Sequence, residues 1–229
     1  LAECWANVDQ SLVLFGLLGA GVGHAVLSMF MNQYYVANLV LLVGTTALTV
    51  LGTQEYFSLP SPSTVSLFSE PTELSFLLVH IMLVYQVYNL IVCCVVKELR
   101  GVLMIVHHAL AILLAVSSLK PYAAAYAPYF FGVVEMSNIP LTARDLVTYA
   151  QQLPGADKNK FATVNLVAGG VFAIQFYATR IVGWFAVSVG FWQQALQVIE
   201  EDTENQYFFV GLVFLVSNAI LTTMQVSEC

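Results

Sequence analysis

Four ionisable side chains stand inside long apolar runs of this 229-residue chain. His107 and His108 are adjacent in one run, Glu135 lies in the next, and Arg180 lies in a later one. A neutral imidazole accepts and returns protons near neutral pH, so either histidine could act as a base. The same four groups could instead line a polar binding cavity, or Glu135 and Arg180 could form a buried ion pair.

The spacing of the two histidines limits this chemistry. Neighbours on a helix point about 100° apart, so His107 and His108 lack the spacing of a helix-borne zinc site, and we predict no metal site. No serine or cysteine stands in a recognisable nucleophile motif. The residues therefore favour a protein without catalysis over an enzyme. If a reaction occurs, His107 and His108 are the candidate catalytic residues.

Two further histidines stand alone in apolar runs. We predict that His24 and His80 pack against neighbouring helices and hydrogen-bond to them. Single membrane histidines also serve as axial ligands of haem or chlorin metals, so both are candidate cofactor ligands if the chain binds haem or a pigment. No other cofactor is implied.

The composition places the chain in a membrane. Hydrophobic residues make up 59% of it and charged residues 9%, against about 25% charged in a soluble domain, and the mean hydropathy is +0.80. Seven apolar runs approach the length that crosses about 30 Å of hydrocarbon as a helix. We therefore predict an all-α, polytopic membrane helix bundle, with residues 1–229 as a single transmembrane domain. The predicted spans are Ser11–Phe30, Tyr34–Leu51, Leu74–Val96, Val102–Leu119, Tyr122–Leu141, Phe161–Val189 and Tyr207–Val226.

Three features concern the path of the chain. Pro140 predicts a break in the fifth span near Asn138, because proline lacks a donor and disfavours helical geometry before it. The sixth span is long enough to tilt or to project beyond the bilayer. Irregular loops are predicted at Gly52–Glu73, Gln151–Lys160 and Glu200–Glu204.

The charges between the spans predict the orientation. With seven spans, Lys120 is the single basic residue between spans that falls on the N-terminal side of the membrane. The basic residues of the opposite side are Lys97, Arg100, Arg144, Lys158 and Lys160. By the positive-inside rule, we predict the N-terminus on the non-cytosolic side and the C-terminus on the cytosol-, stroma- or matrix-like side. No Lys or Arg precedes Ser11, so we expect no uncleaved secretory signal there.

The net charge, the cysteines and the glycines limit the classes of partner that the chain can have. The net charge is −7 and no basic stripe exists, which argues against nucleic acid. Cys93 and Cys94 lie in an apolar run without Cys-x-x-Cys spacing, so we interpret them as small membrane-embedded residues. Gly19, Gly23 and the pair Gly169-Gly170 allow close helix packing, either within the chain or against another membrane subunit.

The order of the polar residues resembles a known family. The order is similar to that of the TLC domain of the TRAM–LAG–CLN superfamily. It consists of a double histidine in a helix, a short turn with proline, a helix with Glu-x-Ser and a late arginine, and a further helix. The residues that carry the resemblance are His107-His108, Lys120-Pro121, Glu135-Met136-Ser137, Leu141–Arg144, Asn165-Leu166 and Phe176–Arg180. They define a TLC-like core of about residues 74–189.

The resemblance implies a single domain of membrane helices around a polar cavity that lipids can reach. One branch, the ceramide synthases, joins an acyl group from acyl-CoA to a sphingoid base and carries a paired-aspartate segment. This chain has Glu135–Arg144 in that place, without the aspartates. It is therefore more similar to the TLC-domain-containing branch, whose members are linked to membrane lipid composition, trafficking and fluidity.

Three functions follow as expectations. The first is a TLC-like protein that binds or senses a membrane lipid and influences lipid composition. Its site would consist of His107, His108, Glu135, Arg144 and Arg180. The second is an accessory structural subunit of a respiratory or photosynthetic complex, docked through Gly-rich helix faces, with pigment as a cofactor only in the photosynthetic case. The third is a histidine-dependent lipid acyltransferase.

Overall fold

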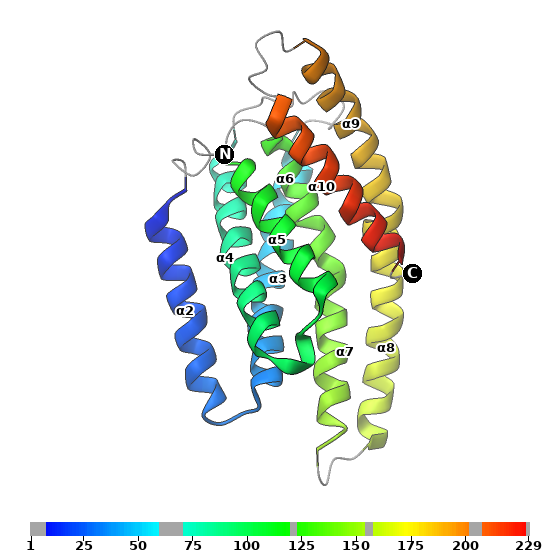
Figure 1. Cartoon of the computed structure of the whole chain (residues 1–229). Helices are drawn as coiled ribbons and strands as arrows, with labels where there is room; N and C mark the ends of the chain where they lie inside the picture. The colour runs from blue at the N-terminus through cyan, green and yellow to red at the C-terminus, as the bar shows by residue number, and fades with distance from the viewer. Residues whose placement is uncertain (1–7, 60–70, 120–122, 154–157, 202–207, 228–229) are drawn as a thin grey trace.

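The structure, a computed structural model, describes residues 8–59, 71–119, 123–153, 158–201 and 208–227. This part of the chain is helical and contains no strand (Figure 1), which confirms the predicted all-α membrane bundle. The helices are α2 (Gln10–Ser28), α3 (Gln33–Ser58), α4 (Glu73–Val95), α5 (Val102–Ser117), α6 (Ala127–Phe131), α7 (Asn138–Ala150), α8 (Lys158–Phe176), α9 (Trp184–Glu201) and α10 (Phe208–Ser227). The short segments are η1 (Lys97–Leu99), η2 (Ala124–Tyr126), η3 (Val133–Ser137) and η4 (Tyr177–Gly183).

The middle of the bundle is formed by α3, α4, α5 and the broken span α6–η3–α7 (Figure 1). At one edge, α2 packs on α4 and α3. At the opposite edge, α8, η4 and α9 form one long rod that packs on α7. The last helix, α10, crosses α9 obliquely and also contacts α5.

Length and hydropathy divide the spans into two groups. Gln10–Ser28, Gln33–Ser58, Glu73–Val95 and Phe161–Glu200 are each long and apolar enough to cross a membrane. The apolar helices Val102–Ser117 and Phe208–Met224 are shorter, and the fifth span is divided into pieces. The sixth span is long, as predicted, but it continues past Val189 to Glu200: its 40 residues extend for about 60 Å, twice the hydrocarbon thickness of a bilayer.

The second span ends later than Leu51, the end that the sequence predicts. α3 continues to Ser58, so the first part of the predicted loop Gly52–Glu73 is helical. Glu55 explains the extension, because its buried carboxylate accepts a hydrogen bond from the hydroxyl of Thr72, the N-cap of α4. The positive end of the α4 dipole favours a carboxylate at this place.

The other two predicted loops are shorter than expected, because a helix extends into one end of each. α8 begins at Lys158, inside the predicted loop Gln151–Lys160, and α9 continues to Glu201, inside Glu200–Glu204. The turn Lys120-Pro121 and the centres of both loops lie outside the described residues.

The fifth span breaks just before the predicted point. The irregular part is η3, a 3₁₀ segment that follows Gly132, and α7 begins after it. Pro140 lies in the first turn of α7, where its missing N–H leaves no helical bond unmade. The break coincides with a close crossing of α3, since a Cβ on Gly132 or on Gly52 would overlap the backbone of the other glycine.

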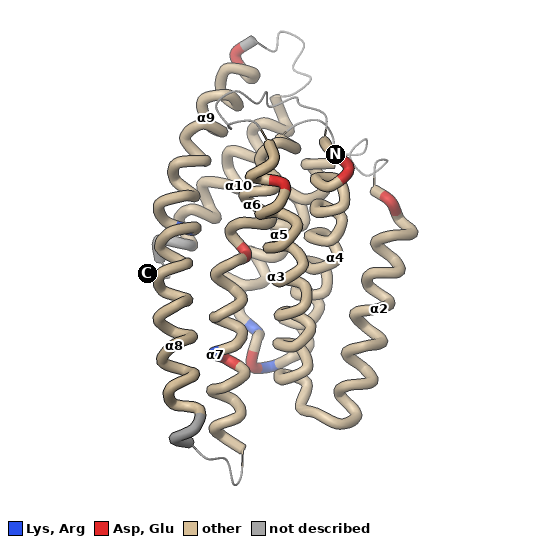
Figure 2. The backbone as a smooth tube through the Cα atoms, turned by 180° about the vertical axis from the view of Figure 1, so that it is seen from behind, with Lys and Arg blue, Asp and Glu red and all other residues tan. Residues whose placement is uncertain are grey.

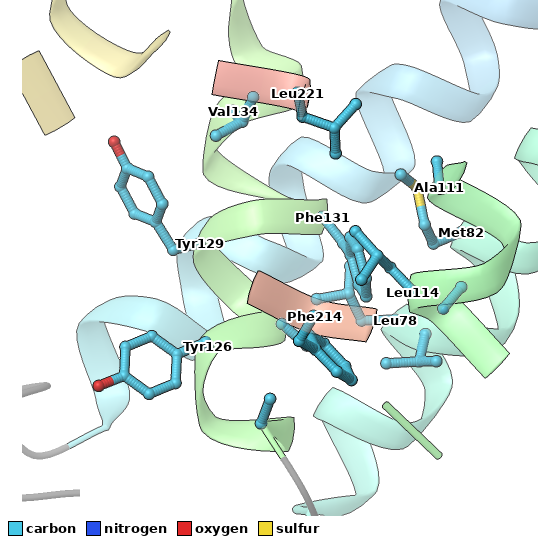
Figure 3. Close-up of a cluster of buried hydrophobic side chains, with 14 of the residues drawn as sticks. Leu78, Met82, Ala111, Leu114, Tyr126, Tyr129, Phe131, Val134, Phe214 and Leu221 are labelled. Atoms are coloured by element: carbon cyan, nitrogen blue, oxygen red, sulfur yellow. The ribbon is translucent and has the colours of Figure 1, made fainter. Parts of the chain in front are cut away.

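Buried apolar side chains from most of the helices form one core, part of which is drawn in Figure 3. The labelled members from α4, α5, α6 and α10 include Leu78, Met82, Ala111, Leu114, Phe131, Phe214 and Leu221. Cys93 is also buried as a free thiol, and Cys94 is a free, exposed one, in keeping with small residues in an apolar run.

Candidate functional site

A polar cavity of about 500 Å³ lies among α3, α4, α5, α7 and η4. Charged residues of the α4–α5 connection and of α7 mark its mouth, and Figure 2 shows charges gathered on these two segments. The charged residues at the mouth are Glu98, Arg100 and Asp145. The deeper wall includes His107, His108, Glu135, Asn138 and Arg180. The cavity therefore combines groups from helices that are far apart in the sequence.

Asn138 joins Glu135 to Arg180. Its amide nitrogen donates to Oε2 of Glu135 at 2.7 Å, and its amide oxygen accepts from Nη2 of Arg180 at 3.0 Å. The link between the carboxylate and the guanidinium in the described chain runs through this amide and not through a direct ion pair. The two opposite charges are thus held apart on the cavity wall.

Each charge has a further hydrogen-bond partner. The hydroxyl of Thr45 lies 3.1 Å from both Oε2 and the backbone carbonyl of Glu135. Nε of Arg180 donates to the hydroxyl of Ser137 at 2.8 Å. Glu135 is 5% exposed and Arg180 is 8% exposed. Charges buried this deeply persist only where several hydrogen bonds satisfy them, so these partners are needed to keep the pair in place.

The two histidines have different roles in the cavity wall. His108 is buried, and its Nδ1 donates to Oε1 of Gln86 on α4 at 2.6 Å. His107 is half-buried, and its ring meets that of His108 edge-on, with the centroids 5.2 Å apart. His108 is therefore fixed by a protein partner, whereas His107 is the more accessible of the two to a ligand.

Arg180 reaches the cavity from an irregular turn of the long rod. η4 is a π-helical turn, in which the wider spacing frees backbone groups from the regular pattern. The hydroxyl of Tyr129 on α6 donates to the carbonyl of Thr179 in this turn, at 2.7 Å. Gly183 leaves room for that hydroxyl, since a Cβ there would overlap it. Tyr129 and Gly183 therefore help to position Arg180.

A narrow apolar pocket of about 50 Å³ adjoins the polar cavity. His107, Glu135 and Arg180 line both spaces. Much of the pocket wall belongs to the core of Figure 3 and includes Ala111, Leu114, Phe131, Phe214 and Leu221. The volume corresponds to about four water positions, so it holds only the end of an apolar chain unless these side chains move.

Arg144 lies outside this site. It lines a separate hollow against α8, together with Asn165 and Gly169. Its neighbour Asp145 lines the mouth of the polar cavity instead. Adjacent helical residues point about 100° apart, and of these two only Asp145 lines the polar cavity. The structure thus brings together the other four residues predicted for a lipid site and leaves Arg144 out.

The two single histidines have protein partners. His80 is fully buried, its Nε2 accepts from the backbone N–H of Asp9 at 2.9 Å, and its Nδ1 donates to the carbonyl of Phe76 at 2.8 Å. His24 Nδ1 lies 2.6 Å from the hydroxyl of Tyr88 on α4. These contacts agree with packing and hydrogen bonding, and they occupy both ring nitrogens of His80.

Several residues of the site are not singled out by the sequence. They are Thr45, Gln86, Asn89, Tyr129 and Asn138. The available signal is a polar, uncharged side chain inside an apolar run, which has to find a partner within the bundle. Asn138 adds a second signal, because it stands three residues from Glu135, a spacing at which helical side chains meet.

These features define a polytopic helical membrane protein with a charged cavity inside its bundle. The family model described as the TLC domain matches residues 26–227, so the chain belongs to the TLC-domain family. The match extends beyond residues 74–189, which carry the resemblance in the sequence. No curated protein and no solved structure matches the chain. The family and the apolar helices together make it an integral membrane protein of a lipid-related family.

Proposed function

We propose that the protein binds a membrane lipid in this cavity and thereby influences lipid composition. The observation that carries the proposal is the junction at which His107, Glu135 and Arg180 line both the polar cavity and the apolar pocket. A lipid has the matching chemistry, since a polar head is joined to an apolar chain. A purely polar solute would leave the pocket empty, and a hydrocarbon would leave the charges without a ligand.

The proposed orientation puts the mouth of the cavity on the cytosol-like side. Lys97 and Arg100 lie in the α4–α5 connection beside the mouth, and basic connections remain on the cytosolic side. The C-terminus then shares that side and the N-terminus lies opposite. Labelling of a C-terminal tag from the non-cytosolic side would contradict this topology.

Within the family, we favour the TLC-domain-containing branch over the ceramide synthases. The paired aspartates of the synthases have no counterpart in Glu135–Arg144, where Asn138 links the charges. An acyltransferase is the second candidate, because His107 lies at the junction where an acyl group and a head group would meet. Acyl transfer that persists in a His107→Gln variant would exclude this role for the histidine.

The lipid proposal is tested on protein purified in a mild detergent. Native mass spectrometry counts the lipids retained by the wild type, Glu135→Gln and His107→Phe, in which a larger ring fills the junction. We expect both variants to retain at least about tenfold less lipid, which corresponds to about 1.4 kcal/mol. Arg144→Gln is the matched control, because Arg144 lies outside the cavity. Equal retention by all four proteins would refute binding at this site.

A further inference from the structure

The deeper wall of the polar cavity carries one positive group, Arg180, and one negative group, Glu135. Arg180 uses Nε for Ser137 and Nη2 for Asn138. A guanidinium has five N–H donors, so further donors remain for a ligand in the cavity that Arg180 lines. These free donors fit an oxyanion such as a phosphate.

The negative side of the wall offers acceptors. Oε2 of Glu135 accepts from the amide of Asn138 at 2.7 Å, and the hydroxyl of Thr45, 3.1 Å from both Oε2 and the backbone carbonyl, has one proton for the two. Oε1 of the same carboxylate has no donor among the described residues. This side of the cavity therefore fits a group that donates hydrogen bonds and carries positive charge.

Asn89 adds an acceptor that lacks a partner within the described chain. The side chain is 4% exposed and lines the cavity, and its Oδ1 accepts no hydrogen bond there. Tyr85, Glu135 and Arg180 line the same cavity as Asn89, so these groups surround one space. A buried carbonyl left without a donor is destabilising, and a ligand with an N–H group would supply the missing hydrogen bond.

We propose that the bound lipid is a zwitterionic phospholipid whose ammonium carries N–H donors. Its phosphate lies against Arg180, and its ammonium lies against Glu135 and Asn89. The proposal rests on the lipid-binding function proposed above and specifies the head group. A quaternary ammonium such as choline has no N–H and leaves Oδ1 of Asn89 unsatisfied. A phospholipid without an ammonium offers no N–H donor to Oε1 of Glu135.

The test is a competition between lipids that share the same acyl chains. The purified full chain is incubated with an equimolar mixture of phosphatidylethanolamine, phosphatidylcholine and phosphatidic acid, and bound species are counted by native mass spectrometry. We expect phosphatidylethanolamine to be retained about tenfold over phosphatidylcholine, as one recovered hydrogen bond implies. Phosphatidic acid is expected to bind more weakly than phosphatidylethanolamine.

Variants separate this proposal from the broader one. Asn89→Leu removes the unpaired acceptor and is expected to abolish the preference for ethanolamine over choline while lipid is still retained. Asn165→Leu is the matched control: its Oδ1 also has no partner in the described chain, but it lines the hollow beside Arg144. Equal binding of the two head groups by the wild type, still sensitive to Glu135→Gln, overturns the head-group proposal and leaves lipid binding standing. Binding that is insensitive to Glu135→Gln overturns both.

Discussion

α2 and the broken span α6–η3–α7 are both apolar, but they differ in the regularity of the helix and in burial. α2 is one regular helix of 19 residues with no buried residue. The broken span changes from α-helix to 3₁₀ segment and back, and it carries Glu135, Ser137 and Asn138. The regular helix stands at the edge of the bundle, and the irregular one stands in the middle (Figure 1).

The difference follows from the hydrogen bonds of the backbone. A regular helix satisfies its own backbone groups and can face lipid alone. An irregular segment needs donors from its neighbours, and the structure supplies them: Thr45 lies beside the carbonyl of Glu135, and Tyr129 donates to that of Thr179. Polar side chains therefore gather where helices are irregular, and the cavity forms at that place.

The largest expected effect comes from the backbone contact that accompanies the break. In Gly132→Ala, the new Cβ would overlap Gly52, so α3 and α6 must separate. We expect the free energy of unfolding to fall by about 3 kcal/mol. Thermal unfolding in detergent measures this loss. The control is Gly21→Ala in α2, where a Cβ meets nothing within 4 Å. If the two variants melt alike, the close crossing is not a constraint on the fold.

The next largest effect is expected at Arg180, which is hydrogen-bonded to two residues of the broken span. Arg180→Met leaves Glu135 buried without its cation and removes donors from Ser137 and Asn138. Removing one partner of a buried charge pair costs about 3 kcal/mol, so we expect the melting temperature to fall by about 6–12 °C. Arg144→Met, in the outer hollow, should change stability by less than about 0.5 kcal/mol. A double variant with Glu135→Gln should recover part of the loss, because no unpaired charge remains.

The regular elements of this fold could be predicted from the sequence because they depend on composition alone. Long apolar runs give the spans, and α2 and α4 begin and end near their predicted residues, whereas the long rod begins near Phe161 but continues past Val189 to Glu201. The end of α3 could not be predicted, because it depends on the pairing of Glu55 with Thr72 of another helix. Local polarity at Glu55 indicates a loop unless the fold supplies that partner.

The candidate site could be predicted in its charges but not in its geometry. His107, His108, Glu135 and Arg180 stand out because ionisable groups are rare in apolar runs. The spacing of Asn138 from Glu135 can be seen in the sequence, but the bond from Asn138 to Arg180 depends on contact between distant spans, and the π-helical turn leaves no pattern in the sequence. Whether Arg144 or Asp145 faces the cavity likewise depends on the rotation of α7.

A smaller effect is expected from the hydroxyl that holds the π-helical turn. Tyr129→Phe removes the hydrogen bond to the carbonyl of Thr179, so the free energy of unfolding should fall by about 1 kcal/mol. Because Arg180 follows Thr179, lipid retention should fall as well. Tyr177→Phe is the control, since Tyr177 lies in the same turn and is exposed. Loss of stability with unchanged lipid retention would show that Tyr129 supports the fold without positioning Arg180.

The smallest effect is expected at the edge of the bundle. His24→Leu removes the 2.6 Å contact with the hydroxyl of Tyr88 that ties α2 to α4. The loss should be below about 1 kcal/mol, because the pair is only partly buried and α2 keeps its apolar packing. Hydrogen exchange should rise in α2 alone, and lipid retention should equal that of the wild type. A fall in lipid retention would mean that α2 shapes the cavity although it does not line it, and the contrast between regular edge and irregular centre would then fail.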